Sequence, residues 1–378
     1  MNYFDYLSPG DRNSLFFLPP APFDRDTERD TLRDAVGGLL YLPGGNPNIA
    51  HIIRSGKIRG LTSMALCLED AVGDAQREQA AENTLNQLAL LAQAVAWGAL
   101  PRERLPLLFV RVESSRMLER LAEDFAACAG VLTGVILPKV TGETLERGLS
   151  LTAAIAADSG VPFYAMPILE SAALMDCPDR LALLRSLKEI TDRYAGRVLN
   201  IRIGATDLCG LCGIRRGVDT TAYQVAVLSS CIADIVRVFA FQDAYTVSGP
   251  VWEFYSALAR SRALQSWSEV NGLLEEVRLD LQNGILGKTC IHPTQLLPVQ
   301  ASYAVPFEAY HDARSILEVD RGQTGVTASA RRNKMNECKP HTLWARKILR
   351  RAGIYGVYQE HTDTAGLIRA VSQGGCYE

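Results

Sequence analysis

The sequence lacks any apolar run that approaches the roughly 20 residues needed to span a bilayer as a helix. Its opening stretch, MNYFDYLSPGDRNSLFFLPP, also lacks the basic start and the small-residue cleavage site of a secretion signal. Apolar residues make up 48% of the chain, as in an ordinary globular protein. We therefore expect a cytoplasmic protein with no membrane partner.

A strong charge of either sign is missing as well. The formal net charge is −3 at pH 7, which gives no global reason to expect nucleic acid or an anionic surface as partner. We find no solenoid-type repeat and no low-complexity tract. The composition leaves small molecules as the expected ligands.

A disulfide framework is also absent, although the chain has nine cysteines. Their number is odd and most lie within apolar segments, which favours reduced thiols. Cys209 and Cys212 form a single C-x-x-C, and no second cysteine pair or suitably spaced histidines follow nearby to complete a zinc site. The surrounding GATDLCGLCG does not have the glycine spacing of a dinucleotide-binding loop. We expect two neutral thiols here.

What the chain does contain is a series of short apolar runs, separated by stretches with helical spacing. There are eight, at 39–46, 63–70, 107–113, 134–140, 163–171, 200–207, 243–250 and 284–293. Continuous apolar runs are typical of buried parallel strands, each of which needs a crossover helix before the next. Plausible helices lie at 74–98, 221–242 and 296–319. The pattern predicts an α/β fold of the (β/α)8 TIM-barrel type.

The domain boundaries follow from composition. Residues 1–36 are rich in proline and charge, which suggests an extended N-terminal arm, and residues 37–319 would form the barrel. Residues 320–378 form a C-terminal extension, where nine Lys or Arg stand against one acid between Arg321 and Arg351. This basic segment is either a solvated terminal helix or a lid that brings cations to an anionic substrate at the barrel mouth, its own or a neighbour's.

Most of the apolar runs end in groups that can do chemistry. These are Gly45 and Asn46, Glu69 and Asp70, Arg111, Lys139, Glu170, Asp207, Ser248 and His292. Catalytic residues of a TIM barrel gather at the carboxyl ends of its strands. Glu170 and Asp207 lie just past neighbouring strands, and two carboxylates suit Mg²⁺ or Mn²⁺, which prefer oxygen ligands. The alternative is that either carboxylate forms a structural ion pair with Arg111, Lys139 or Arg202.

A second group surrounds this pair. Glu69 and Asp70 are adjacent, so on a strand they would point to opposite faces; we expect Glu69 to point inward and Asp70 to cap the following helix. Arg111 lies between apolar residues and suits a substrate carboxylate, or else a pairing with Glu69 or Glu170. Lys139 would neutralise developing enolate charge or balance the carboxylates.

Two loops offer candidate binding groups. Gly44, Gly45 and Asn46 follow the first strand, where glycines permit backbone N–H groups to face an anion, although glycine-rich turns are common punctuation. Lys288 and His292 lie in the last run, the region where barrels often bind phosphate. Both could meet a phosphate or an acyl carrier; a buried, hydrogen-bonded histidine is the alternative.

The motifs LYLPGGNPN, LCLEDAV, VRV, LPK, LES, GATDL and GKTCIHPTQ occur in this order over residues 37–310. In this respect the chain resembles the citrate lyase beta-subunit and HpcH/HpaI aldolase family. The resemblance implies a Mg²⁺-dependent, usually oligomeric TIM barrel that cleaves or forms a C–C bond in 3-hydroxy acyl thioesters or 2-keto acids. It also implies metal ligation by Glu170 and Asp207, carboxylate binding by Arg111, and an acidic pair at Glu69 and Asp70.

The chain departs from the family pattern in three places. Its first loop reads PGGNP without an arginine, Glu113 follows the VRV motif, and NKMNECKPHTLWARKIL (333–349) is an added C-terminal segment. These departures are more typical of a divergent C–C bond lyase branch. They weaken any assignment of a citryl thioester substrate or of coenzyme A binding.

We therefore expect a homo-oligomeric Mg²⁺-dependent C–C bond lyase acting on a small carboxylate substrate, with a coenzyme A thioester as an unproven possibility. In this reading Glu69 and Asp70 orient a metal-bound water that serves as base. Two other readings stay open. One is a phosphoenolpyruvate/pyruvate-type barrel enzyme acting on a free keto acid, and the other is a non-catalytic barrel that serves as a binding or assembly component.

Overall fold

The computed structural model describes residues 1–255, 268–319, 326–328 and 334–373. Its central sheet has eight parallel strands: β2 (Gly38–Pro43), β3 (Ser63–Cys67), β4 (Leu107–Arg111), β5 (Gly134–Leu137), β6 (Tyr164–Leu169), β7 (Asn200–Ile203), β8 (Thr246–Ser248) and β9 (Lys288–Cys290). The strand order is β8-β7-β6-β5-β4-β3-β2-β9, and a parallel bridge between Gly249 and Lys288 joins the two edges. The predicted (β/α)8 TIM barrel is confirmed.

The strands are short and largely apolar because both faces of the sheet are covered, although β7, β8 and β9 also carry polar residues, among them Arg202 and Lys288. Every residue of β3, β4, β5, β6 and β7 is buried. Inward side chains fill the barrel and outward side chains pack under the helices, so no alternation of polar and apolar residues is needed. This is why continuous apolar runs identified all eight strands.

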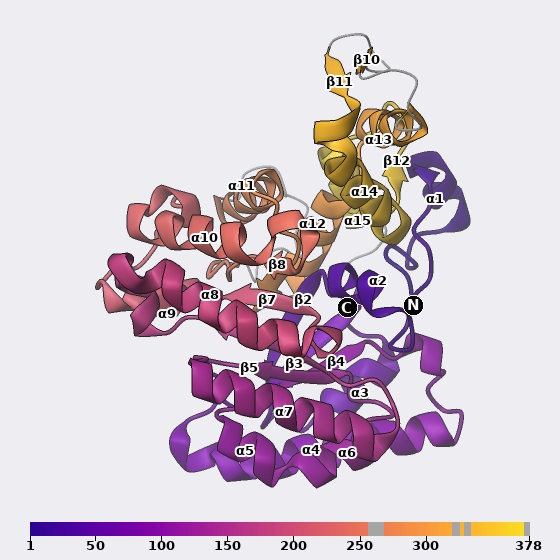
Figure 1. Cartoon of the computed structure of the whole chain (residues 1–378). Coiled ribbons are helices and arrows are strands. Elements are labelled where there is room, and N and C mark those ends of the chain that lie inside the picture. Colours follow the sequence, from indigo (N-terminus) through magenta and orange to yellow (C-terminus); the bar gives the residue numbers. More distant parts are fainter. Residues whose placement is uncertain (256–267, 320–325, 329–333, 374–378) are drawn as a thin grey trace.

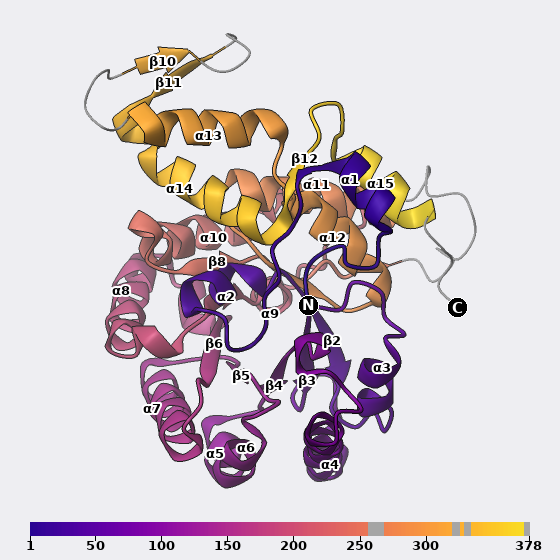
Figure 2. The ribbon, with the colours of Figure 1, turned by 90° about the vertical axis from the view of Figure 1, so that its right-hand side faces the viewer.

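Helices surround the strands (Figure 2). They are α3 (Ile49–Ser55), α4 (Arg77–Ala96), α5 (Ser115–Arg120), α6 (Ala122–Cys128), α7 (Gly142–Ser159), α8 (Cys177–Arg193), α9 (Ala205–Leu211), α10 (Ala226–Phe239), α11 (Ser268–Gln282) and α12 (Leu296–Tyr303). Among the described residues no helix is both long enough and apolar enough to cross a membrane.

The N-terminal segment is more ordered than the extended arm expected over residues 1–36. It contains α1 (Pro9–Leu15), strand β1 (Phe16–Leu18) and α2 (Arg29–Ala35), and only 19–24 is irregular and proline-rich. Tyr3 and Phe4 are fully buried, and the Tyr3 hydroxyl donates to the Ala35 carbonyl at 2.8 Å. Apolar side chains such as these anchor the segment against the rest of the molecule.

The last expected barrel helix, 296–319, is divided in two. α12 ends at Tyr303, Ala304 is extended with ψ 146°, and α13 (Phe307–Val319) begins after Pro306. Proline removes a backbone donor and pushes the preceding residue out of helical geometry, which accounts for the break.

α13 packs on α14 (Cys338–Tyr355) around a small apolar cluster separate from the main core. Strands β10 (Val326–Ala328) and β11 (Met335–Glu337) form an antiparallel pair next to these helices (Figure 1). β12 (Val357–Tyr358) pairs with β1, and α15 (Thr364–Gln373) follows. The C-terminal extension thus begins in structure at α13 and includes the partner of the N-terminal strand.

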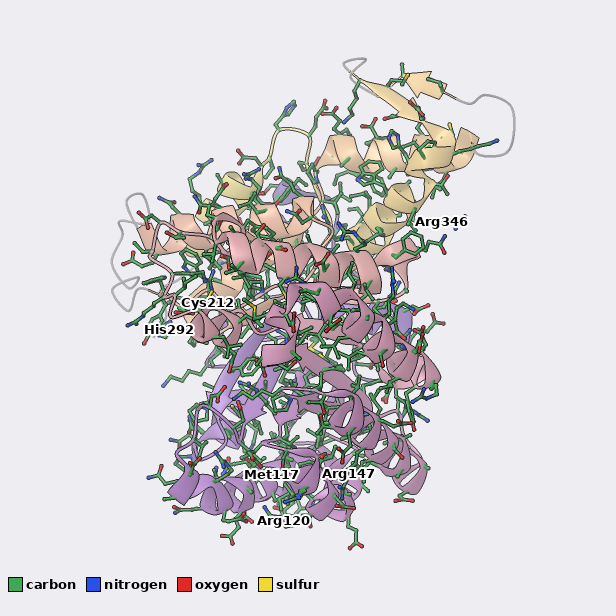
Figure 3. All side chains as sticks on the ribbon, turned by 60° about the vertical axis from the view of Figure 1, so that its left-hand side comes forward. Met117, Arg120, Arg147, Cys212, His292 and Arg346 are labelled. Carbon is green, nitrogen blue, oxygen red and sulfur yellow. The ribbon has the colours of Figure 1, made fainter. Side chains whose placement is uncertain are left out.

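The extension lies at the amino end of the barrel strands. Arg350 on α14 donates to Asp34, before β2, and its Nη1 lies 2.8 Å from Asp243 Oδ2, before β8. Asp34 in turn accepts a hydrogen bond from Thr246, the first residue of β8. In Figure 3, Arg346 of α14 lies on the opposite side of the molecule from Cys212 and His292, which belong to loops at the strands' carboxyl ends.

This position corrects the idea of a lid over the chain's own barrel mouth. The described cations Lys347 and Arg350 pair with Asp243 at the far end of the barrel, where they join the N-terminal and C-terminal segments to it. Arg321, Arg331 and Arg332 lie outside the described residues. Closure over a neighbour's barrel stays a prediction.

Candidate active site

Charged side chains converge at the carboxyl ends of the strands, which we call the barrel mouth. Glu69 and Asp70 follow β3, Arg111 ends β4, and Lys139 follows β5. Glu170 follows β6, and Asp207 lies in the first turn of α9, after β7. The structure places all six of these predicted residues in one connected network.

Arg111 is the centre of this network. Its Nη2 lies 2.7 Å from Glu69 Oε2, 3.1 Å from Asp70 Oδ2 and 3.3 Å from Glu170 Oε1, and its side chain is 11% exposed. Burial alone would lower the pKa of the guanidinium, but Tyr41 and the carboxylates of Glu170 and Glu69 raise it. Arg111 therefore neutralises carboxylates of its own chain, as the ion-pair alternative anticipated.

Lys139 reaches the same carboxylates from the next strand. Its Nζ lies 2.6 Å from Glu69 Oε1, 3.3 Å from Asp70 Oδ1 and 3.6 Å from Asp207 Oδ1, and its backbone N–H donates to Glu170 Oε1 at 3.0 Å. Its φ of 48° is in the left-handed region, an unusual conformation for lysine that often occurs at functional sites. Burial would lower the pKa of the ammonium, but the hydrogen bond and charge of Glu69 and the charges of Asp207 and Asp70 raise it. Lys139 stays protonated while remaining half-exposed.

Glu69 and Asp70 do not behave as strand neighbours. β3 ends at Cys67, so both lie in a turn where alternation no longer applies, and both contact Arg111 and Lys139. The expectation that Asp70 caps the next helix is wrong, since the N-cap positions of the following 3-10 turn and of α4 are Gly73 and Gln76.

The two carboxyl groups nevertheless differ in environment. Glu69 is 6% exposed and Asp70 53% exposed, so Glu69 is the inward group as expected. Burial and the neighbouring Asp70 raise the pKa of Glu69. Burial would also raise the pKa of Asp70, but its hydrogen bond with Glu69 and the charges of Arg111 and Lys139 lower it. Asp70 is therefore the ionised, accessible member of the pair.

Glu170 and Asp207 form the candidate metal pair. The Glu170 side chain is 2% exposed, and its Oε1 takes the backbone hydrogen bond from Lys139, whereas no partner among the described residues hydrogen-bonds to Oε2. Burial raises the pKa of Glu170 to about 7, Arg111 opposes this, and the negative charges of Asp207 and Glu69 add to it. Asp207 is 30% exposed, so this member of the pair is accessible to solvent.

Gly204 makes room for this carboxylate, and the sequence reasoning did not single it out. A Cβ at position 204 would lie 2.0 Å from Glu170 Oε2 and 2.4 Å from Glu170 Cβ. Gly204 is the N-cap of α9, three residues before Asp207, so the GATD motif positions both ligand candidates. The glycine of the GATD motif is the feature of the sequence that could have identified this close contact.

The donor set fits a divalent cation that prefers oxygen. Two neighbouring carboxylates, one buried and with an oxygen free of hydrogen bonds, repel each other until a cation lies between them. In the part of the chain that the structure describes, no cluster of three or more His, Cys, Asp or Glu is arranged to hold a metal ion. The protein would then supply two ligands, and water or substrate oxygens the rest, as is common for Mg²⁺.

The first-loop residues are placed at the mouth but not as an anion-binding nest. Gly44 donates its N–H to the Cys67 carbonyl at 2.8 Å, and a Cβ there would lie 2.5 Å from Leu68 Cδ2. Neither Gly44 nor Gly45 has positive φ, and the Asn46 side chain accepts from the Asn48 N–H within the loop. Gly44 thus serves close packing of this loop against β3.

The assignment of Lys288 to ligand binding is wrong. Lys288 begins β9, at the amino end of the strand, and its fully buried Nζ lies 2.7 Å from Glu276 Oε1 and 2.8 Å from Asp280 Oδ2 on α11. The strand starts this late because Gly284 and Gly287 both have positive φ. Lys288 joins β9 to α11 and does not face the mouth.

His292 does lie at the carboxyl end of β9. Its Nδ1 is 2.8 Å from Thr294 Oγ1, and it caps the following 3-10 turn over 293–295. Its ring stacks on Tyr255 with centroids 4.4 Å apart and an interplanar angle of 6°. His292 is placed where a ligand could meet it, but its observed contacts are those of a hydrogen-bonded, stacked side chain.

Comparison with known proteins identifies a family for this chain and similar folds among solved structures. The model of the family described as C–C bond lyase of the TIM-barrel fold matches residues 30–357. No curated protein sequence matches the chain.

Among solved structures, the chain is similar to CitE from Mycobacterium tuberculosis in complex with magnesium, acetoacetate and coenzyme A. The identity is 22% and the TM-score 0.53, over 85% of this chain and 99% of that chain. It is also similar to Haloferax volcanii malate synthase in its pyruvate/acetyl-CoA ternary complex, with 14% identity and a TM-score of 0.52 over 82% and 90% of the two chains. At these identities the likeness is one of fold.

Proposed function

The chain belongs to the family of C–C bond lyases with the TIM-barrel fold, and from this premise we propose that it is a Mg²⁺- or Mn²⁺-dependent lyase. It would cleave or form a C–C bond next to a carbonyl group in a small substrate that carries a carboxylate. Glu170 and Asp207 would hold the metal. When bound, the ion would supply a Lewis acid that stabilises negative charge developing on a carbonyl oxygen.

The observation that carries this proposal is that Glu170, fitted closely against Gly204, lies in the same charged network as Asp207. Burial and the charge of Asp207 raise the pKa of Glu170 to about 7 although Arg111 opposes this rise, so a further cation at the site would stabilise the ionised form. Only glycine at position 204 leaves space for Glu170 Oε2.

The remaining residues of the network have separable tasks. Lys139, protonated and half-exposed, would donate a hydrogen bond to a substrate oxygen. Asp70, ionised and 53% exposed, would accept the proton of a substrate hydroxyl or of a water. Arg111 and Glu69 are buried and would hold Asp70, Glu170 and Lys139 in place.

The ligands of two similar structures support a class of substrate. A C–C bond next to a carbonyl occurs in 3-hydroxy acyl thioesters and in 2-keto acids, and both leave an enolate-like group on cleavage. CitE is bound to acetoacetate and coenzyme A with magnesium, and malate synthase to pyruvate and acetyl-CoA. On the shared fold, this supports a thioester or a keto acid as the ligand of the present chain. The homo-oligomeric state and the cytoplasmic location stay predictions.

The test is metal binding and turnover in carboxylate-to-amide variants. Mg²⁺ or Mn²⁺ should raise the melting temperature of the wild type, because a ligand that binds only the native state stabilises it. Glu170→Gln and Asp207→Asn should lose this shift and lose turnover of oxaloacetate or of an acyl thioester. Asp124→Asn, an exposed carboxylate on α6, is the matched control and should behave as wild type. Wild-type metal affinity in both site variants would contradict the proposal.

Adding pyruvate, oxaloacetate or acetyl-coenzyme A to the metal-loaded protein separates the substrate classes. A further shift with acetyl-coenzyme A alone would indicate a thioester enzyme. A shift with the keto acids alone would indicate a free acid as substrate.

A further inference from the structure

Arg202 is a buried cation on β7, the strand that leads to Asp207, and its guanidinium contacts β8 and β9 rather than the carboxylate network. Its side chain comes from β7, and the residue is 1% exposed. Nη1 donates to Ser248 Oγ at 3.2 Å, at the end of β8, and Nη2 donates to Thr289 Oγ1 at 2.7 Å, in β9. Since β8 lies between β7 and β9, a side chain that reaches from β7 to β9 crosses the barrel interior.

The partners of Arg202 are all uncharged. Besides Ser248 and Thr289, Nη1 lies 3.5 Å from Asn200 Oδ1, and no carboxylate of the described residues lies within salt-bridge distance. Its Nε has no hydrogen-bond partner. A buried guanidinium without a counter-ion is expensive, and other buried arginines of this chain, such as Arg180 and Arg216, have one.

The carboxylates of the mouth are already held by other cations. Glu69, Asp70, Glu170 and Asp207 lie against Arg111 and Lys139. None of the four is within salt-bridge distance of Arg202, so its charge remains available for one carboxylate of a substrate.

Thr289 connects this charge to the mouth. It is partly exposed, whereas its neighbours Lys288 and Cys290 are buried. Its Oγ1 accepts a hydrogen bond from the Arg202 guanidinium, so the hydroxyl hydrogen remains available to donate, and the hydroxyl is polarised by the neighbouring positive charge. Tyr41 of β2 lies in the same interior: burial raises the pKa of its hydroxyl, and the charges of both Arg202 and Arg111 oppose that rise.

We propose that Arg202, acting through the Thr289 hydroxyl, recognises the substrate's carboxylate and orients it on the β8–β9 side of the mouth, beside the metal pair. Thr289 contacts the carboxylate, and Arg202 is a positioning residue that supplies the positive charge. Arg111 was expected to bind the substrate carboxylate, but it already contacts the carboxylates of Glu69, Asp70 and Glu170. The proposal gives this task to Arg202 and Thr289 instead. The inference rests on the proposed function for the metal, but it concerns side chains that do not hold the metal.

The experiment measures binding of malonate, a stable dicarboxylate, by thermal shift and calorimetry, with and without Mg²⁺. Malonamide, which has the same skeleton without charge, is the ligand control. Malonate should bind the wild type and malonamide should not. Arg202→Met should weaken malonate binding by about tenfold or more, and Arg202→Lys should restore part of it, because the charge returns without the planar fork. Mn²⁺ affinity, measured without malonate, should be unchanged in both variants.

A second variant keeps the test decisive if Arg202→Met does not fold. Thr289→Val should weaken malonate binding by about threefold or more, since one charge-polarised hydrogen bond is lost. Thr152→Val, a buried threonine on α7 whose hydroxyl bonds to the Gly148 carbonyl, is the matched control and should bind malonate as wild type does.

Three results would overturn the inference. They are wild-type malonate affinity in Thr289→Val and in folded Arg202→Met, equal binding of malonate and malonamide, and no malonate binding at all. Absence of Mn²⁺ binding in the wild type would instead contradict the proposed metal pair, and the malonate series would still decide the role of Arg202.

Discussion

At the scale of single residues, the Glu170 carboxylate depends on the missing side chain at Gly204. Burial and the charges of Asp207 and Glu69 keep the pKa of Glu170 near 7, and Oε2 occupies the space that a Cβ at position 204 would fill. Gly204 has negative φ, so alanine could adopt its backbone geometry. The space, not the backbone conformation, requires glycine here.

Gly204→Ala should therefore leave the fold intact and displace Glu170. We expect Mn²⁺ affinity to fall by about tenfold or more, the usual effect of disturbing the surroundings of a metal ligand. Gly210→Ala is the matched control: it lies in the same helix, α9, and a Cβ there would meet nothing within 4 Å. Titration calorimetry with Mn²⁺ compares the two variants, and equal affinities would remove the steric role assigned to Gly204.

Residue by residue, the sequence predicted where charged groups gather but not how they pair. Glu69, Arg111, Lys139, Glu170 and Asp207 were found because each follows an apolar run. That Arg111 binds three carboxylates, while Arg202 binds none, depends on side chains from different strands meeting across the barrel. Such contacts are fixed by closure of the sheet, and no local pattern encodes them.

At the scale of elements, β9 shows how a strand boundary decides a residue's task. The apolar run at 284–293 predicted the strand, but Gly284 and Gly287 delay its start to Lys288. Lys288 therefore lies at the amino end, where Glu276 and Asp280 of α11 neutralise it. A hydrophobic pattern locates a strand more reliably than it locates the strand's ends. Here the position of the first residue of β9 decides that Lys288 has a structural role and not a binding role.

Lys288→Met should destabilise the protein without affecting the mouth. Glu276 keeps Arg216 as a partner, but Asp280 would be left fully buried without a cation. Losing one partner of a buried pair costs about 3–5 kcal/mol of unfolding free energy. Chemical denaturation measures this change; Lys57→Met, at an exposed position, should cost less than about 0.5 kcal/mol. Near-wild-type stability together with weakened malonate binding would restore Lys288 to the ligand site.

At the scale of the whole molecule, the family assignment and the TIM barrel are confirmed, whereas the two terminal segments were poorly predicted. Their charge and proline content suggested an arm and a lid. In the structure, Arg33 and Arg350 both bind Asp243, so the two segments and the barrel meet at one carboxylate. Composition alone cannot show that segments more than 300 residues apart in the sequence share a partner.

Asp243 should make this junction sensitive to acid. Burial would raise the pKa of its carboxyl, but the hydrogen bonds from Arg350 and the charges of Arg33, Arg350 and Lys347 lower it. A carboxyl group with a lower pKa in the folded state adds stability above its unfolded pKa, near 4, and loses that contribution as the pH falls below it. Asp243→Asn should thus cost about 1–3 kcal/mol at pH 7 and progressively less from pH 4 to pH 3.

Denaturation of wild type and variant across this pH range measures the difference. Asp30→Asn, whose side chain is 72% exposed and pairs with Arg29, is the control and should show almost no effect at any pH. A constant difference between wild type and Asp243→Asn down to pH 3 would show that the carboxyl's ionisation does not stabilise the junction.

The pairing of β1 with β12 has a consequence for how the chain is made. Phe16 pairs with Tyr358, so β1, which is synthesised early, cannot form its strand pair until β12 has been synthesised near the end of the chain. At ribosomal rates of about 5–20 residues per second, that wait is on the order of tens of seconds. During it Tyr3, Phe4 and Phe16, all buried in the finished molecule, have no completed surface to cover them. We therefore expect the N-terminal segment of the nascent chain to expose apolar side chains until translation is complete. A chaperone that binds aromatic segments would bind there.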